Sequence, residues 1–149
     1  MSSFKGSYTY TVDAKGRVNL PSKLKKNVSP DARDQFVITF GVQQCLVVYP
    51  LDEWNVLESK LRGLNEFLIE PQAFLHVMLE HAEDTELDSQ SRITIPQGHR
   101  EYANIQNEVK IIGLLNKIEI WNPTLYEEYK KNNIKKSVAE MAADTMGKQ

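Results

Sequence analysis

Alternating polar and apolar residues near the N-terminus predict a half-buried β-strand. Over residues 7–12, the aromatic and valine side chains fall on one face, and serine and threonine fall on the other. This period of two is typical of a strand with one buried face. The polar segment Asp13–Gly16 follows, and alternation then resumes with Arg17 and Asn19 on the outward face. The pattern therefore predicts a β-hairpin with a polar outer face.

The same pattern returns in the second half of the chain, as Leu-Asp-Ser-Gln-Ser-Arg-Ile-Thr-Ile-Pro over residues 87–96. Three pairs of landmarks are each 75 residues apart: Asp13 and Asp88, Arg17 and Arg92, Pro21 and Pro96. Three more are each 72 apart: Gly41 and Gly113, Leu46 and Ile118, Tyr49 and Trp121. The spacing predicts two tandem copies of one unit. The alternative is two unrelated hairpin pairs that share turn chemistry.

Further strands and helices complete each copy. We expect strands over Phe36–Phe40, Cys45–Tyr49, Thr85–Leu87, Val109–Leu114 and Lys117–Trp121. We expect helices from Pro21 to Val28, after Pro50, over Gln72–His81, from Pro96 to Tyr102 and over Thr124–Lys131. The packing stripe of the helix over Gln72–His81 is predicted to be Phe74, Leu75, Met78 and Leu79. Beyond Asn132 the helical spacing is marginal, and the last three residues are expected to fray.

One copy buries too little apolar surface to be stable alone, whereas two can interlock about a pseudo-two-fold axis and close into a small barrel. We therefore predict a mainly β protein with short helices, built as a single domain from residues 1–149. Its predicted parts are a first repeat (5–62), a connecting helical segment (63–82), a second repeat (83–131) and a C-terminal tail (132–149).

Several classes of site are disfavoured by the sequence. The single cysteine, Cys45, permits no internal disulfide, and its apolar surroundings indicate a buried small hydrophobe. His76, His81 and His99 do not have metal-ligand spacing, so we predict no metal and no cofactor. There is no phosphate-binding glycine loop and no nucleophile signature, hence no predicted small-molecule substrate. With no apolar run of membrane-spanning length and no signal peptide, we expect a cytoplasmic protein.

Charge is unevenly distributed, although the formal net charge is only −2. Residues 1–27 contain six lysines and arginines against one aspartate, whereas residues 81–104 contain two arginines against five carboxylates. If either turn meets a phosphate backbone, this distribution favours the first turn.

Three motifs give the chain a resemblance to a known family. They are Asp-x-Lys-Gly-Arg-x-x-x-Pro-x-Lys from Asp13, Cys-Leu-Val-Val-Tyr-Pro-Leu-Asp-Glu-Trp from Cys45, and Leu-Asp-x-x-x-Arg-x-x-x-Pro from Leu87. In this order they closely resemble the MraZ family of bacterial transcriptional regulators, from about Lys5 to about Tyr129. The resemblance implies an AbrB-like swapped-hairpin fold and ring-shaped homo-oligomers. It also implies binding to double-stranded promoter DNA at the nucleoid and repression of the protein's own division and cell-wall operon.

The candidate DNA-binding residues lie in the first turn. Arg17 can donate two parallel hydrogen bonds to guanine or to a phosphate. Asp13 can hold that guanidinium or cap the turn, Gly16 supplies positive φ, and Lys15 suits a phosphate contact. Asn19 shares the face of Arg17 and can extend the contact. The alternative is a surface ion pair between Asp13 and Arg17 that only stabilises the turn.

The second turn, with Asp88 and Arg92, is a weaker candidate. Ser91 replaces the glycine of the family pattern, the turn contains no lysine, and its neighbourhood is acidic. The alternatives for Arg92 are a DNA contact and an ion pair with Asp88. We therefore expect Arg17 to contribute more to DNA binding than Arg92.

Two other functions remain as alternatives. An AbrB-like antitoxin or protein-interaction module would use the tail after Asn132 to bind a partner protein. An enzyme would pair Asp13 with Asp88 as catalytic carboxylates. The enzyme is disfavoured because an arginine four residues from each aspartate depresses the pKa of a carboxyl group rather than raising it.

Overall fold

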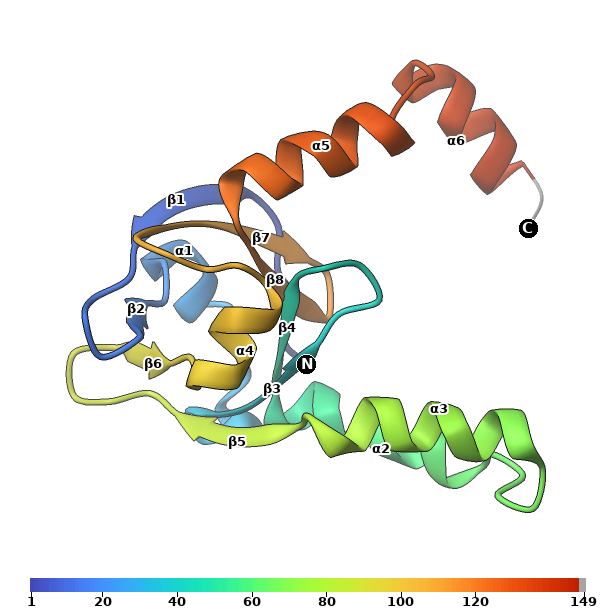
Figure 1. Ribbon diagram of the computed structural model, residues 1–149, viewed down its shortest axis with the longest axis horizontal. Coiled ribbons are helices and arrows are strands. Elements are labelled where there is room, and N and C mark those ends of the chain that lie inside the picture. Colours follow the sequence, from blue (N-terminus) through green and yellow to red (C-terminus); the bar gives the residue numbers. More distant parts are fainter. Residues whose placement is uncertain (148–149) are drawn as a thin grey trace.

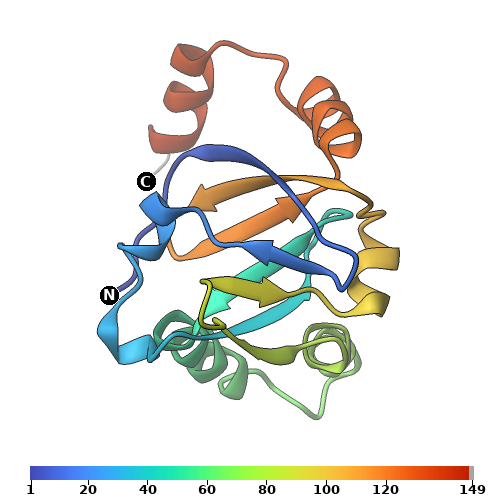
Figure 2. The same ribbon diagram turned by 90° about the vertical axis from the view of Figure 1, so that its left-hand side faces the viewer.

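The strands form two antiparallel sheets in the computed structural model, which describes residues 1–147 (Figure 1). The larger sheet has the order β1-β7-β8-β4-β3-β5, and the smaller is a ribbon of β2 and β6. The strands are β1 (Ser7–Thr11), β2 (Arg17–Asn19), β3 (Gln35–Phe40), β4 (Leu46–Pro50), β5 (Glu83–Glu86), β6 (Arg92–Thr94), β7 (Glu108–Leu114) and β8 (Lys117–Trp121). Figure 2 shows the ribbon lying across the larger sheet.

Short helices connect the strands. They are α1 (Ser22–Lys25), the 3₁₀-helix η1 (Pro30–Ala32), α2 (Leu51–Arg62), α3 (Ile69–Glu80), α4 (Gln97–Tyr102), α5 (Pro123–Asn133) and α6 (Val138–Met146). Between residues 1 and 147, no helix combines the length and the apolarity that crossing a membrane requires.

The two repeats interlock. Strand β1 of the first repeat pairs with β7 of the second, and β5 of the second pairs with β3 of the first. The predicted hairpin of the strands around Asp13–Gly16 is therefore wrong, because β1 and β2 flank the first turn without pairing and β2 pairs with β6 of the other repeat. In the ribbon, Val18 lies opposite Ile93, its counterpart 75 residues on. In the centre of the larger sheet, Leu46 pairs with Ile120 and Val48 pairs with Ile118. This register is that of a pseudo-two-fold axis, so the predicted mainly β, swapped-hairpin fold from two tandem repeats is confirmed.

The core lies between the ribbon and the larger sheet. Its ribbon side is formed by Val18, Leu20, Ile93 and Ile95, each at most 6% exposed. Alternate residues of the central strands face it, and their neighbours face outward, so both faces of β4 are buried. On the outer face, Trp54 anchors α2 and Trp121 packs against α5. The ribbon is therefore held by apolar contacts beneath it, which leaves its upper face free.

Helix α3 differs from its prediction. It begins at Ile69 rather than Gln72, and Pro71 lies in its first turn, where a missing N–H is tolerated. The predicted packing stripe is confirmed only in part: Leu75 and Met78 are partly buried, whereas Phe74 and Leu79 are 47% and 46% exposed, and no residue of α3 is fully buried. The helix protrudes from the sheet beside α2 (Figure 1), and its C-terminal part reaches β3, where the Thr39 hydroxyl donates to the Met78 carbonyl at 3.2 Å.

The C-terminal tail is more regular than its sequence indicates. Helix α6 begins with a capping box, in which Ser137 accepts a hydrogen bond from the Glu140 backbone and Glu140 accepts one from the Ser137 backbone. Lys136 also pairs with Asp144 at 2.7 Å. The fraying expected at Lys148 and Gln149 lies outside the described residues. Helix α1 is shorter than expected and ends at Lys25, although hydrogen-bonded turns continue to Val28.

Candidate nucleic-acid interface

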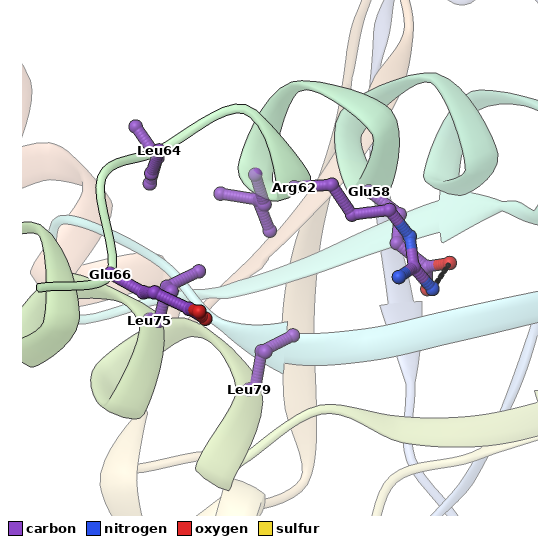
Figure 3. Close-up of a pocket in the computed structure, with 7 residues that line it drawn as sticks. Glu58, Arg62, Leu64, Glu66, Leu75 and Leu79 are labelled. Atoms are coloured by element: carbon purple, nitrogen blue, oxygen red, sulfur yellow. Dashed lines mark hydrogen bonds and ion pairs between the residues drawn. The ribbon is translucent and has the colours of Figure 1, made fainter.

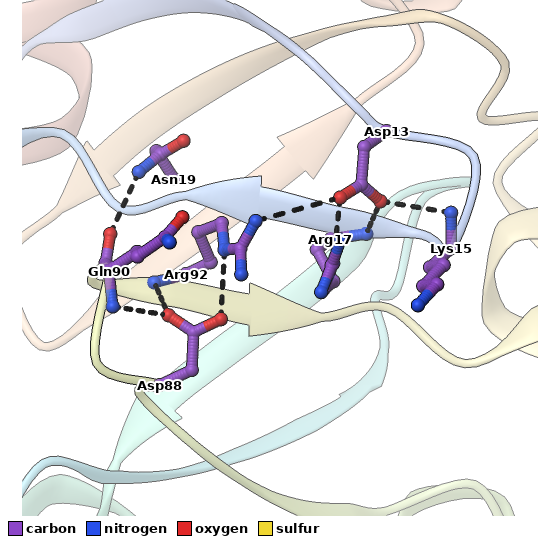
Figure 4. Close-up of polar contacts among 7 residues, drawn as sticks. All are labelled: Asp13, Lys15, Arg17, Asn19, Asp88, Gln90 and Arg92. Atoms are coloured by element: carbon purple, nitrogen blue, oxygen red, sulfur yellow. Dashed lines mark hydrogen bonds and ion pairs between the residues drawn. The ribbon is translucent and has the colours of Figure 1, made fainter.

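The outer face of the β2–β6 ribbon gathers polar side chains from both repeats. Arg17 lies opposite Thr94, and Asn19 lies opposite Arg92. These four residues alternate with the buried Val18 and Ile93, so the pleat alone points them away from the core. The side chains of Arg17 and Arg92 are 31% and 21% exposed. The ribbon thus presents two arginines in a pseudo-two-fold arrangement (Figure 4).

The first turn, residues 13–17, is organised by one carboxylate. Asp13 Oδ1 accepts hydrogen bonds from the backbone N–H groups of Lys15 and Arg17, at 3.0 and 2.8 Å. Its Oδ2 accepts one from Arg17 Nε at 2.7 Å. The backbone closes the turn, with the Gly16 N–H donating to the Asp13 carbonyl at 3.0 Å. Asp13 therefore fixes both the turn and the direction of the arginine.

The second turn, residues 88–92, repeats this geometry. Asp88 Oδ1 accepts from the backbone N–H groups of Gln90 and Arg92, both at 2.9 Å, and its Oδ2 accepts from Arg92 Nε at 2.8 Å. Both Asp–Arg ion pairs offered as alternatives are thus present. Each pair uses Nε, a donor on the inner side of the guanidinium, so it orients the arginine without occupying all of its donors.

These hydrogen bonds stabilise the charged form of both aspartates. The pKa of Asp13 is lowered, chiefly by the Arg17 backbone N–H and further by the Arg17 side chain and the Lys15 backbone. The pKa of Asp88 is lowered in the same way, chiefly by the Arg92 backbone N–H. Both carboxylates are therefore ionised at neutral pH, where each accepts a hydrogen bond from its arginine.

The two turns are also linked to each other. Arg92 Nη1 lies 3.9 Å from Asp13 Oδ2, so the second arginine reaches the carboxylate that holds the first. The Asn19 side-chain amide donates to the Gln90 carbonyl at 3.0 Å. Figure 4 shows these contacts across the ribbon. Asn19 is therefore tied to the second turn, and the ribbon behaves as one unit rather than two separate sites.

Each turn also receives a cation from a helix of the other repeat, which the sequence reasoning missed. Lys25 of α1 donates to the Ser91 hydroxyl of the second turn at 2.5 Å. Arg100 of α4 donates from Nε to the Ile95 carbonyl at 3.0 Å and lies over Gly16 of the first turn. Lys25 and Arg100 are 75 residues apart, so the repeat spacing contained this signal. Figure 2 shows α1 and α4 flanking opposite ends of the ribbon.

Backbone conformation and neighbouring atoms explain why the tip of the first turn is a glycine and that of the second is a serine. Gly16 and Ser91 both have positive φ, +80° and +60°. A Cβ on Gly16 would lie 2.8 Å from Arg100 Cζ and 2.8 Å from the Ile95 carbonyl oxygen, closer than van der Waals contact allows. The first turn therefore needs glycine for close approach as well as for conformation, whereas the second turn accommodates a side chain.

Two of the three histidines, His81 and His99, pack against the ring of Phe40. His81 stacks on Phe40 with ring centroids 4.0 Å apart, and His99 meets Phe40 edge-on at 5.1 Å. His99 Nε2 lies 2.7 Å from the His81 carbonyl oxygen. Within the described residues, no group of three or more histidine, cysteine, aspartate or glutamate side chains has the arrangement of a metal site. Cys45 is buried, which raises its pKa to about 12 and leaves it a neutral thiol.

Comparison with known proteins places these features in a family. The family described as "MraZ protein, putative antitoxin-like" matches residues 3–76 and again residues 78–149. A transcriptional regulator MraZ from Acetivibrio thermocellus is 39% identical over 142 residues, covering 94% of this chain and 96% of its own. One from Thermoanaerobacter pseudethanolicus is 41% identical over 137 residues, covering 92% of each chain. One from Caldicellulosiruptor saccharolyticus is 46% identical over 117 residues, covering 78% of this chain and 79% of its own.

Proposed function

Because the chain belongs to the MraZ family, whose curated members are named transcriptional regulators, we propose that it regulates transcription by binding promoter DNA through the outer face of the β2–β6 ribbon. The observation that carries the proposal is the pair of arginines, Arg17 and Arg92, each fixed by an ionised aspartate on an exposed two-stranded ribbon. The major groove of B-DNA is wide enough to admit such a ribbon.

The side chains divide into base-reading and phosphate-contacting groups. Arg17 and Arg92 suit bidentate hydrogen bonds to guanine, and Asn19 suits a contact to adenine. Lys15, at the tip of the first turn, is exposed and suits a phosphate. Asp13, Asp88 and Gly16 act indirectly, because they set the shape of the turns. The pseudo-two-fold ribbon matches the approximate two-fold symmetry of a DNA groove.

We further propose that the protein acts at the nucleoid as a ring-shaped oligomer and represses its own division and cell-wall operon. A single ribbon offers few base contacts, each contributing about 1–3 kcal/mol. Several ribbons bound to tandem promoter repeats gain avidity of roughly 10²–10⁴ without new contacts. The proposal therefore requires repeated operator boxes and a steep loss of affinity with salt.

A titration of fluorescent promoter DNA tests the proposal. Wild-type protein should bind the upstream DNA of its own operon in preference to a scrambled sequence, at two salt concentrations. The Arg17→Ala variant should lose specific binding while keeping its circular dichroism spectrum and its mass in solution. Wild-type affinity in a folded Arg17→Ala protein would refute the role of the ribbon.

A second candidate is a protein-interaction module of the antitoxin type. It is favoured by the exposed apolar residues of α3 and α6, such as Phe74 and Val138, which are 47% and 80% exposed. It predicts binding of a partner protein that is lost on removing residues 134–149, with DNA binding unaffected. We propose no enzymatic activity, because a lowered pKa at Asp13 and Asp88 is opposite to that of a general acid.

A further inference from the structure

The helical hairpin formed by α2 and α3, residues 51–82, contains several large apolar side chains that are exposed. Its tip contains Phe67 and Ile69, which are 89% and 90% exposed, and Val77 on α3 is 60% exposed. Between the two helices lies a groove lined by Leu61, Leu64, Leu75 and Leu79, with Glu58, Arg62 and Glu66 beside them (Figure 3). Contiguous apolar surface of this kind marks an interaction site.

The C-terminal arm, residues 123–147, also exposes apolar side chains. Ile134, Val138 and Met146 are 48%, 80% and 72% exposed. Helix α6 has nine residues and lies apart from the sheet at the end of the arm (Figure 1). An isolated helix of that length is marginal in water even with a good cap. Its apolar residues therefore need a surface to cover them.

The hairpin and the arm are structural counterparts. Helix α2 follows the β3–β4 hairpin of the first repeat, and α5 follows the β7–β8 hairpin of the second. They leave opposite flanks of the larger sheet, and both extend away from the ribbon (Figure 1). In both views the arm lies far from the hairpin of its own chain. Contacts between the arm of one copy and the hairpin of another would therefore keep the ribbons uncovered.

The hairpin is acidic, whereas the part of the arm around Ile134 is basic. The hairpin contains six carboxylates and two cations, and Glu58 and Glu66 line its groove. The arm has four lysines and four carboxylates, but all four lysines lie between residues 130 and 136, where there is no carboxylate, and Ile134 lies among them. Lys130 and Lys136 pair with carboxylates of the arm itself, which leaves Lys131 and Lys135 next to Ile134 as the cations available to the groove. Docking of the arm would bring an apolar residue flanked by cations to an apolar groove bordered by carboxylates, which favours this pairing over two hairpins or two basic segments.

We infer that the arm of one copy of this chain docks in the α2–α3 groove of a second copy, with Ile134 and Val138 against Leu64 and Leu79. The inference deepens the proposed function, since it gives the oligomer its contact surface. Such a contact joins two different surfaces, so each copy offers one arm and one groove. Repetition of the contact closes a ring when the rotation between copies permits.

Complementation between two defective variants tests the inference. A groove variant contains Leu64→Glu and Leu79→Glu, and an arm variant contains Ile134→Glu and Val138→Glu. By light scattering without DNA, each alone should have the monomer mass of 17.1 kDa, whereas wild-type protein should be larger. An equimolar mixture should form a heterodimer, because one intact arm then meets one intact groove. Leu115→Glu, at a residue 72% exposed in the β7–β8 turn, is the matched control and should retain the wild-type mass.

Every other result overturns the inference. An arm variant that stays oligomeric while the groove variant is monomeric indicates contact between two hairpins, and the reverse indicates contact between two arms. A wild-type monomer excludes the contact altogether. Truncation after Asn133 removes the docking residues without adding charge, and it should also give a monomer. Because Arg17→Ala should retain the wild-type mass, failure of DNA binding and failure of assembly are measured separately.

Discussion

The two turns of the ribbon share one backbone design and differ in how cations reach them. In both, an aspartate accepts two backbone N–H groups and one guanidinium Nε. The first turn has its own lysine, Lys15, and a glycine over which Arg100 lies. The second turn has neither, but its Ser91 receives Lys25 from the first repeat.

This difference shows that the charge of a turn is not set by its local sequence. The second turn lies in an acidic stretch, yet the swapped fold brings it a cation that is 66 positions away along the chain. Conversely, Lys25 of the basic N-terminal stretch contacts the second turn rather than the first. The asymmetry inferred from local charge is therefore smaller in the folded protein than in the sequence.

The largest effects should come from the two ribbon arginines. We expect Arg17→Ala to weaken specific DNA binding about a hundredfold, and Arg92→Ala to weaken it about tenfold, because each removes a base contact of about 1–3 kcal/mol. Arg92 should cost less because its side chain is less exposed and also reaches Asp13. Fluorescence anisotropy with promoter DNA measures both.

The control for this comparison is Lys60→Ala, which removes an exposed cation of α2 that is not among the residues lining the α2–α3 groove. It should leave DNA affinity unchanged. Equal losses for Arg17→Ala and Arg92→Ala would mean that the two turns are functionally equivalent, as their hydrogen bonds are.

Much of this site could be predicted from sequence, because its signals are local. Alternation placed Val18 inward and Arg17 outward, and a spacing of four joined Asp13 to Arg17. The 75-residue period gave the repeat and hence the pseudo-two-fold fold. These features depend on residues a few positions apart, or on the repetition of one pattern.

Other features could not be predicted, because they depend on how the repeats interlock. The contacts of Lys25 with Ser91 and of Arg100 with the first turn need the pairing of β2 with β6, which no local pattern specifies. The exposed part of the α3 stripe was misjudged for a similar reason. Helical spacing shows that apolar residues share a face, but not whether the same chain covers that face.

Exchanging the residue types at the tips of the two turns should change the free energy of unfolding far more in the first turn than in the second. We expect Gly16→Ser to lower the free energy of unfolding by about 2 kcal/mol, because it places a side chain at positive φ and against Arg100. Its partner variant, Ser91→Gly, should change stability by less than about 0.5 kcal/mol, since its position tolerates glycine. Urea denaturation measures both. A Gly16→Ser protein as stable as wild type would show that Arg100 does not need the space.

Removing the cations supplied by the helices should have a smaller effect on DNA binding. Lys25→Met and Arg100→Met should each weaken binding a few-fold and similarly on specific and non-specific DNA, because a phosphate contact does not read sequence. Each should also reduce the slope of log affinity against log salt by about one. Lys60→Met, on the hairpin, is the matched control. Loss confined to specific DNA would instead indicate that these side chains position the arginines.

The smallest expected effect is that of pH on the stability of the two turns. Its origin can be assigned either to the backbone N–H groups or to the arginine side chain. The folded pKa values of Asp13 and Asp88 lie below the ordinary value of 3.8, so their contribution to stability is complete above that pH and is lost only as pH falls through the lowered values. We expect both turns to remain intact from pH 5 to pH 8.

The main cause of the lowered pKa of Asp13 is the backbone N–H of Arg17, which the Arg17→Ala variant retains. Carboxyl NMR titration should therefore show most of the lowering of the Asp13 pKa in that variant, whereas a peptide of residues 11–19 should show none. A return to the ordinary pKa in Arg17→Ala would mean that the guanidinium, rather than the shape of the turn, holds the carboxylate.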